Sequence, residues 1–250
     1  MKDVELYSGF RKFGWKAYEQ GRIPAARKAA DYFLGQNEDD GDANQLLGLV
    51  SYAEAEFQKS VAALETASLI QPLRLASQVC LALGYAQIGR RSLALDLLRD
   101  LASKEDMPIA LTVEIATGLN LVDRPDLALR TIQKVIRQDQ SHAQAWYDFG
   151  YYIGLCGGCD TEVEKTARRA IALDSKNSRY RIGLAGLLYR HNRMEEAIEV
   201  IECLSEKAIL AIDCICCLQK VVELYRRADD GFRTLAAIRQ LKKLHRQKSS

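Results

Sequence analysis

The chain has 250 residues, of which 48% are hydrophobic and 27% charged, which supplies ample material for a core and excludes an intrinsically disordered protein. The formal net charge is only +2, so the molecule as a whole has no strong electrostatic attraction to nucleic acid or to an anionic membrane. There are only 4 prolines and 16 glycines, while Ala, Leu, Arg, Gln and Glu prevail, and this composition predicts an all-α protein.

No targeting or membrane-spanning segment is predicted. The first ten residues lack the basic stretch and apolar run of a secretory signal, and no segment approaches eighteen unbroken apolar residues. The seven cysteines are an odd number, which fits reduced thiols better than a disulfide framework. We therefore expect a cytoplasmic chain that does not insert into a membrane.

Small and large apolar residues recur along the chain every 34 residues, with one extra residue after Gly150 and a looser fit near the end. Two columns of small residues and one column of large residues share this register: Gly14, Gly48, Ala82, Ala116, Gly150, Ala185 and Val222; Ala26, Ser60, Ala94, Ala128, Val163, Ala197 and Thr234; Phe13, Leu47, Leu81, Ile115, Phe149, Leu184 and Val221. The register predicts a single domain, 1–250, built of seven units: 7–40, 41–74, 75–108, 109–142, 143–177, 178–211 and a diverged 212–248.

The units resemble the tetratricopeptide repeat, a helix–turn–helix of thirty-four residues. In the fifth unit Trp146, Phe149 and Gly150 stand at the spacing of the W-x2-L-G opening of that repeat, although Ile153 replaces its tyrosine. Pro72 lies where the second unit should close with its proline. The resemblance implies a right-handed α-solenoid of about seven helical hairpins.

The predicted hairpins follow one another with matching turn residues. Gly21, Gly89 and the pair Gly157–Gly158 lie between paired helices, while Pro24 and Pro125 fall in the first turn of second helices, where a missing N–H is harmless.

A last helix, about 231–246, is expected to cap the stack. An apolar stripe of residues is predicted to face the preceding unit: Phe232, Leu235, Ile238, Leu241 and Leu244. No comparable cap precedes the first unit, which suggests either a truncated chain or an edge covered by a partner or a second copy. A homo-oligomer through the N-terminal repeat is therefore compatible with the sequence.

The resemblance implies that a peptide lies along the concave face formed by the first helices. Carried over position by position, the predicted groove is apolar and aromatic through most of its length and consists of Arg11, Trp15, Tyr18, Leu49, Tyr52, Val79, Leu83, Val113, Asn120, Tyr147, Tyr151, Arg179, Ile182 and Tyr189. Such a surface is typical of a protein interaction site.

An aromatic stripe at helical spacing can also belong to the core. For Tyr18, Tyr52 and Tyr189, packing against a neighbouring repeat is an equal alternative to lining the groove. Trp15, Tyr147 and Tyr151 fall opposite the column of large apolar residues, so the groove is favoured for them.

The set of residues that clamps the C-terminal carboxylate of chaperone tails in similar repeats is absent. Trp15 stands where Asn is needed, and later clamp positions are occupied by Leu46, Val79 and Cys80. An asparagine ladder, which similar repeats of glycosyltransferases use, is also missing, because Asn120 is alone on the face. We expect a hydrophobic or mixed ligand.

The cysteines offer two candidate metal motifs. Cys156 and Cys159 have the C-x2-C spacing of metal ligands, and Cys214, Cys216 and Cys217 cluster two units later. A turn and a helix two units apart cannot supply four converging zinc ligands, so we predict no metal and no cofactor. We expect the cysteines, Cys80 and Cys203 included, to be small buried hydrophobic residues, apart from one turn with reducible thiols.

No catalytic pattern is present. His142, His191 and His245 each fall near a turn or a terminus and are expected to be solvated, and there is no phosphate-binding loop. The basic tail 239–248 is expected to be a solvated face and not a nucleic-acid site. The sequence predicts a non-catalytic scaffold or chaperone-like adaptor for a protein or peptide partner. The alternative is a targeting or substrate-recognition module of a larger enzyme or of a secretion or assembly complex.

Overall fold

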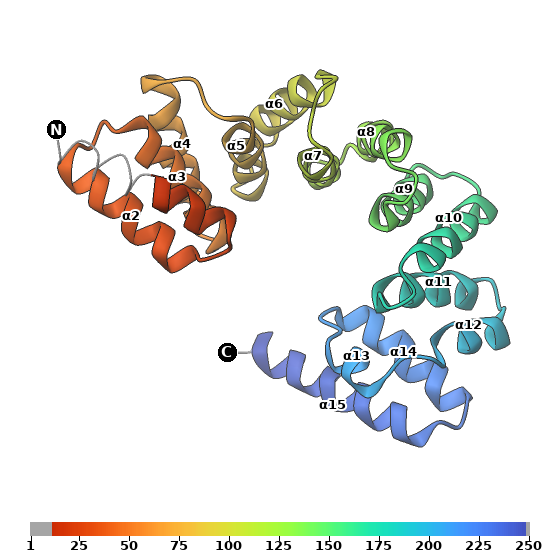
Figure 1. Ribbon diagram of the computed structural model, residues 1–250. Helices are drawn as coiled ribbons and strands as arrows, with labels where there is room; N and C mark the ends of the chain where they lie inside the picture. Colours follow the sequence, from red (N-terminus) through yellow and green to blue (C-terminus); the bar gives the residue numbers. More distant parts are fainter. Residues whose placement is uncertain (1–11, 249–250) are drawn as a thin grey trace. The chain divides into compact units, whose positions relative to one another are not determined.

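The computed structural model describes residues 12–248, which form helices and contain no β-strand, so the predicted all-α class is confirmed. After a helical stretch at 12–19, the helices are α2 (Ile23–Gln36), α3 (Gly41–Ala53), α4 (Phe57–Ile70), α5 (Leu75–Gln87), α6 (Arg91–Ser103), α7 (Ile109–Leu121), α8 (Pro125–Gln138), α9 (Ala143–Leu155), α10 (Asp160–Leu173), α11 (Ser178–Arg190), α12 (Met194–Ile201), α13 (Glu206–Leu210), α14 (Ile215–Arg227) and α15 (Gly231–Lys248) (Figure 1). None of the helices in the described part combines the length and apolar character needed to cross a lipid bilayer.

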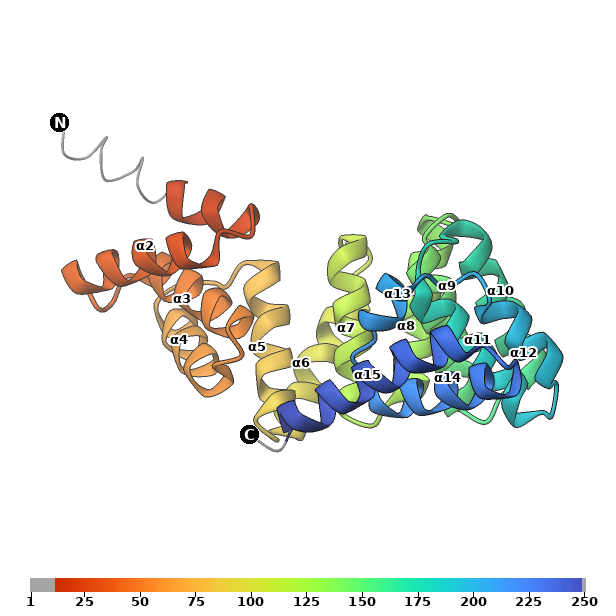
Figure 2. The ribbon, with the colours of Figure 1, turned by 90° about the horizontal axis from the view of Figure 1, so that it is seen from below.

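The chain divides into two compact units, Met1–Thr131 and Ile132–Ser250, which we call unit 1 and unit 2. In unit 1, α3 packs against α2, α4 and α5, and α5 packs against α6 and α7. In unit 2, α10 packs against α9 and α11, α11 against α12, and α15 along α14 (Figure 2). Each unit is thus a series of packed helices that follow one another in sequence. The finer division into seven repeats stays a prediction.

The columns of small residues mark the points where helices approach most closely. A Cβ atom added to Gly48 of α3 would lie 2.4 Å from Cγ of Leu64 in α4, and one added to Gly150 of α9 would lie 2.1 Å from Oγ1 of Thr166 in α10. Ala94 is fully buried in α6. Residues without bulk are required there because helix backbones at this separation leave no room for a larger side chain.

The turns inside the hairpins share one backbone feature. In the described part of the chain one residue per turn has a positive φ between 53° and 81°, and these positions are 34 residues apart up to Gly157, then 35 and 37: Gly21, Ala55, Gly89, Asp123, Gly157, Asn192 and Asp229. Glycine adopts this left-handed conformation without strain, and Asp and Asn tolerate it. Alanine is not suited to this conformation, and the helices on both sides hold the backbone of Ala55 in it.

The regular pattern is interrupted after α12, which has only 8 residues and is followed by the 5-residue helix α13. Side chains from α14 and α15 donate hydrogen bonds to carbonyls of this irregular segment. Tyr225 Oη donates to the carbonyl of Ile201 over 2.8 Å, and Gln240 Nε2 donates to that of Ile212 over 2.9 Å. The backbone groups freed by the short helix are therefore satisfied by the last helical pair.

The last helix packs through a different face from the predicted one. Phe232 and Leu235 are 67% and 62% exposed, while Ala236 and Ala237 are buried. Ile238, Leu241 and Leu244 do pack against the core of unit 2. The prediction is wrong for its first two members because α15 places small alanines against α14, which turns the two larger side chains outward.

Candidate functional site

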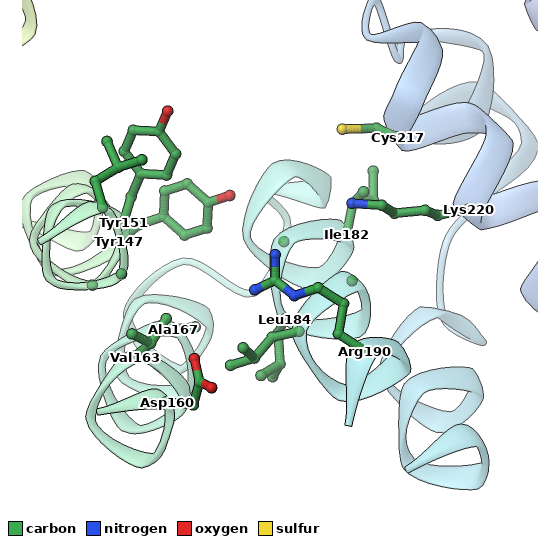
Figure 3. A pocket seen from close by; sticks show the side chains of 16 residues that line it. Tyr147, Tyr151, Asp160, Val163, Ala167, Ile182, Leu184, Arg190, Cys217 and Lys220 are labelled. Atoms are coloured by element: carbon green, nitrogen blue, oxygen red, sulfur yellow. The ribbon is translucent and has the colours of Figure 1, made fainter. Parts of the chain in front are cut away.

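A cavity of about 370 Å³ lies in unit 2, where α9, α10, α11 and α14 come together (Figure 3). We call it the unit-2 pocket. Its lining is mainly apolar and consists of Tyr147, Gly150, Tyr151, Gly154, Leu155, Asp160, Val163, Ala167, Ile182, Gly183, Leu184, Gly186, Leu187, Arg190, Cys217 and Lys220. A cavity of this size matches the smaller ligand pockets of proteins, and it accommodates a large side chain.

One wall of the pocket is aromatic and comes from α9. The ring of Tyr147 lies against that of Tyr180, with 4.9 Å between centroids, and the guanidinium of Arg179 lies 5.2 Å from the Tyr147 centroid. Burial raises the pKa of Tyr147. Tyr151, one turn further along α9, is 49% exposed. Tyr147 is thus held in place by neighbours, whereas Tyr151 offers its ring to solvent.

Glycine makes room for this wall. A Cβ atom on Gly183 of α11 would lie 2.3 Å from the phenol oxygen of Tyr147, and one on Gly150 of α9 would lie 2.1 Å from Oγ1 of Thr166. Ile182, from α11, is a buried apolar residue of the lining. The helices can therefore meet closely around the pocket.

The opposite side of the pocket is basic. Arg190, from the end of α11, and Lys220, from α14, both extend their charged groups toward the cavity (Figure 3). Among the described residues, neither side chain has a carboxylate within ion-pair distance. The acidic residue of the lining, Asp160, is instead paired with Nε2 of His191 at 2.9 Å. The pocket therefore presents unpaired positive charge beside apolar and aromatic surface.

A second charged pair flanks the aromatic wall. Arg179 lies 3.6 Å from the buried carboxylate of Asp148 while it covers the ring of Tyr147. Burial raises the pKa of Asp148, and the charge of Arg179 opposes that rise. Arg179 is thus a surface residue that also stabilises the packing around Tyr147.

In unit 1 the aromatic residues of the predicted groove pack against the core. The guanidinium of Arg74 lies 3.9 Å from the Trp15 centroid. Tyr18 and Tyr52 pack against a cluster that includes Leu49 and Leu64, and burial raises the pKa of Tyr18 to about 12. For Tyr18 and Tyr52 this arrangement favours the packing alternative.

The other predicted groove residues are dispersed. Leu49, Val79 and Leu83 are buried in unit 1, Val113 and Asn120 are half-buried, and Arg11 lies outside the described residues. In unit 2, Tyr189 is half-buried against the core, and Arg179 is exposed. The residues of the predicted set that line the unit-2 pocket are Tyr147, Tyr151 and Ile182.

Sequence reasoning missed the basic side of the pocket. Arg190 and Lys220 are thirty residues apart in the sequence, and neither is among the predicted groove residues. The only available signal is that Gln219 and Lys220 interrupt an apolar stretch of α14, between Leu218 and Val221. Nothing in the sequence indicates that the two charges face one cavity.

Two histidines have specific structural partners. Nδ1 of His142 accepts a hydrogen bond from the backbone N–H of Ala145 over 3.2 Å and so caps α9. His191 pairs with Asp160, which is 31 positions earlier in the sequence. A search for acids within one or two helical turns of His191 therefore misses this pair. Each side chain thus has a defined partner, and His191 is exposed to solvent as well.

The cysteines are more exposed than expected. Cys80 is buried, as predicted, but Cys203 is exposed because α12 ends at Ile201 and the chain leaves the helix there. Cys156 and Cys159 are exposed in the turn between α9 and α10.

Comparison with known proteins relates two segments of the chain to a repeat family. A sequence model of the tetratricopeptide repeat matches residues 11–72 and 164–202, one segment in each unit. No curated protein sequence matches the chain.

Several solved structures share its fold. PilF of Pseudomonas aeruginosa is 16% identical, with 84% of this chain and 93% of that chain covered and a TM-score of 0.62. YrrB, described as a tetratricopeptide-repeat protein with an unusual peptide-binding site, is 17% identical, with 68% and 88% covered and a TM-score of 0.54. MamA is 18% identical, with 66% and 98% covered and a TM-score of 0.56. Two segments of the chain therefore match the tetratricopeptide repeat, and the fold is an all-α solenoid of helical repeats.

Proposed function

We propose that this protein is a non-catalytic adaptor that holds a peptide segment of a partner protein in the unit-2 pocket. The bound segment places a large apolar side chain against Tyr151 and Ile182 and a neighbouring acidic side chain against Arg190 and Lys220. The observation that carries the proposal is the pairing of an apolar, partly aromatic cavity with two cations that have no carboxylate partner among the described residues.

The apolar part of the pocket supplies most of the binding free energy. Full burial of a Leu or Phe side chain contributes about 1.5–3 kcal/mol. Tyr151 adds an aromatic anchor, and tyrosines are enriched among the residues that dominate protein interfaces. Its 49% exposure leaves much of the ring for a partner to cover.

The basic part supplies specificity. A carboxylate that approaches Arg190 and Lys220 is attracted by two charges in a partly enclosed site, where solvent screens less than on an open surface. A neutral amide in its place leaves both cations without that partner. Acidic side chains are therefore preferred at this position.

The acid is expected within the segment and not at its end. Trp15, Val79 and Cys80 replace the residues that hold a terminal carboxylate in similar repeats, so this chain lacks that clamp. The family context agrees with the class of function, since tetratricopeptide-repeat proteins bind protein partners and are generally non-catalytic scaffolds. The peptide-binding site named for YrrB belongs to that protein.

The test selects peptides from a random library displayed on phage with the purified chain as bait, followed by fluorescence anisotropy on the selected peptides. The expected consensus combines Leu, Phe or Trp with a nearby Asp or Glu. Lys220→Glu and Tyr151→Ala should each weaken binding on the order of tenfold, which corresponds to about 1.4 kcal/mol. Replacing the peptide acid by its amide should weaken wild-type binding and leave the Lys220→Glu variant little affected.

Matched controls are present in the chain. Arg226→Glu changes the same charge on the same helix outside the pocket lining, and Tyr32→Ala removes an equally exposed tyrosine from unit 1. Both controls should bind like wild type. Selected peptides that bind equally to all four variants, or only through a free C-terminal carboxylate, would contradict the proposal.

A further inference from the structure

Three cysteine side chains gather at the start of α14. Cys214 is the N-cap residue of that helix, and Cys216 and Cys217 follow in its first turn. The three sulfur atoms lie within 4.8 Å of one another, with 2.9 Å between Sγ of Cys214 and Sγ of Cys216. The backbone N–H of Cys217 donates to Sγ of Cys214 over 3.4 Å. The triad is thus formed by local backbone geometry and does not depend on distant segments.

The donor set is selective for soft cations. Thiolates favour Cu(I) and zinc over Mg²⁺, Ca²⁺ and Mn²⁺, which prefer oxygen ligands. Structural zinc takes four protein ligands in a tetrahedron. Among the described residues, no fourth His, Cys, Asp or Glu joins the group formed by Cys214, Cys216 and Cys217. A three-sulfur site is therefore incomplete for structural zinc and suits a cation that accepts three-coordination.

We propose that Cys214, Cys216 and Cys217 form a binding site for one Cu(I) ion, held by three sulfur ligands. The ligating thiols release their protons to solvent as the ion binds. Three thiolates and one Cu(I) carry a net charge of two negative units. The positive end of the α14 dipole lies at the triad, and Lys220 follows one turn further along the helix, so both offset this charge.

The position of the triad allows the ion to enter. Cys216 is exposed, and Cys214 and Cys217 are half-buried, so one ligand can capture the ion from solvent and two can enclose it. Cys217 also lines the unit-2 pocket, but the metal proposal does not rest on the peptide proposal.

The other exposed cysteines provide an internal comparison. Cys156 and Cys159 have metal-ligand spacing, yet Sγ of Cys159 lies 2.9 Å from the hydroxyl oxygen of Thr161 and the pair joins no group of three ligands among the described residues. We therefore assign the copper site to the α14 triad alone.

The test uses the full chain, reduced and kept without oxygen, with all seven thiols verified as free. A Cu(I) complex is titrated in competition with a coloured Cu(I) chelator, and the ion bound is counted by elemental analysis. Wild type should retain one Cu(I) per chain, with a thiolate-to-copper charge-transfer band and only sulfur neighbours in X-ray absorption. Zn(II) added in the same way should be removed by dialysis.

Variants locate the site. Cys216→Ser should weaken Cu(I) binding at least tenfold, and the triple variant Cys214→Ser/Cys216→Ser/Cys217→Ser should retain none. Cys156→Ser/Cys159→Ser is the matched control and should bind like wild type. Circular dichroism verifies that each variant is folded. The assignment would be overturned if wild type retained no Cu(I) or if the triple variant bound like wild type. Loss of binding in the Cys156/Cys159 control would overturn it as well.

Discussion

The phenol oxygen of Tyr147 lies so close to Gly183 that a Cβ atom on that glycine would stand 2.3 Å from it. The ring cannot easily move away, because it packs against the ring of Tyr180 and is covered by Arg179. Gly183→Ala should therefore displace the aromatic wall and lower the free energy of unfolding by about 1–2 kcal/mol, even though alanine favours helix by about 0.5–1 kcal/mol. Chemical denaturation measures the change.

Gly186 is the matched control, since it lies on the same helix and also lines the pocket. A Cβ atom there would meet only Lys220, at an ordinary 3.6 Å. Gly186→Ala should raise the free energy of unfolding by about 0.5–1 kcal/mol. Stabilisation by both substitutions would contradict the close approach at Gly183.

The buried column of small residues can be tested in unit 1. Ala94 of α6 is fully buried, so Ala94→Leu should lower the free energy of unfolding by roughly 1–3 kcal/mol through overpacking. Ser92→Leu places the same side chain on an exposed position of the same helix and should leave stability almost unchanged. Equal thermal midpoints for Ala94→Leu and wild type would show that the site tolerates bulk.

The left-handed turn residue at Ala55 predicts stabilisation by glycine. Ala55 has a φ of 60°, a conformation that costs a non-glycine residue about 1–2 kcal/mol. Part of the gain from Ala55→Gly is offset by the greater freedom of glycine in the unfolded chain, so a net rise of about 0.5–1 kcal/mol is expected.

Ala62, exposed in the middle of α4, is the control for Ala55. The same substitution there should destabilise by about 0.5–1 kcal/mol because it weakens a helix interior. Thermal or chemical denaturation of the two variants should give shifts of opposite sign, and a loss of stability in both would refute the strain at Ala55.

An ion-pair network predicts a pH dependence in unit 2. Arg193, the N-cap residue of α12, donates hydrogen bonds to Glu164 of α10, and together with Arg168 it lowers the pKa of Glu164 below the ordinary 4.5. A carboxyl whose pKa is lower in the folded state stabilises the fold above the unfolded value. This contribution is lost as the pH falls from about 4.5 through the folded pKa.

Glu164→Gln should therefore be less stable than wild type at neutral pH and should lose less stability on acidification. The expected difference is modest because the pair is partly solvated. Glu195→Gln is the control, since Glu195 is exposed and has no ion pair among the described residues. The thermal midpoints of Glu164→Gln and wild type, measured across the acidic range, should converge as the pH falls. Parallel curves would exclude the effect.

The helical fold was predictable because its main constraint is local in sequence. Close helix crossings require small side chains at Gly48, Ala94 and Gly150, and this need repeats with the period of the hairpin. The turns were only partly readable. A glycine such as Gly89 indicates a left-handed backbone conformation in the sequence. Ala55 adopts the same conformation although alanine disfavours it.

The pocket was less predictable, because a periodic pattern assigns a helix face but not what lies opposite it. Trp15 and Tyr151 occupy the same place in the 34-residue register, yet Trp15 packs against core clusters while Tyr151 borders a cavity. Arg190 and Lys220 meet at that cavity only through tertiary packing. Long side chains take their direction from neighbours that the sequence does not place.

The short helix α12 has a consequence for how unit 2 opens. Because the carbonyls of Ile201 and Ile212 accept hydrogen bonds from Tyr225 and Gln240, the segment 202–214, which includes α13, cannot detach without breaking bonds to α14 and α15. The segment and the last helical pair should therefore behave as one cooperative element, with amide hydrogens that exchange at similar rates and not in the order of their surface exposure.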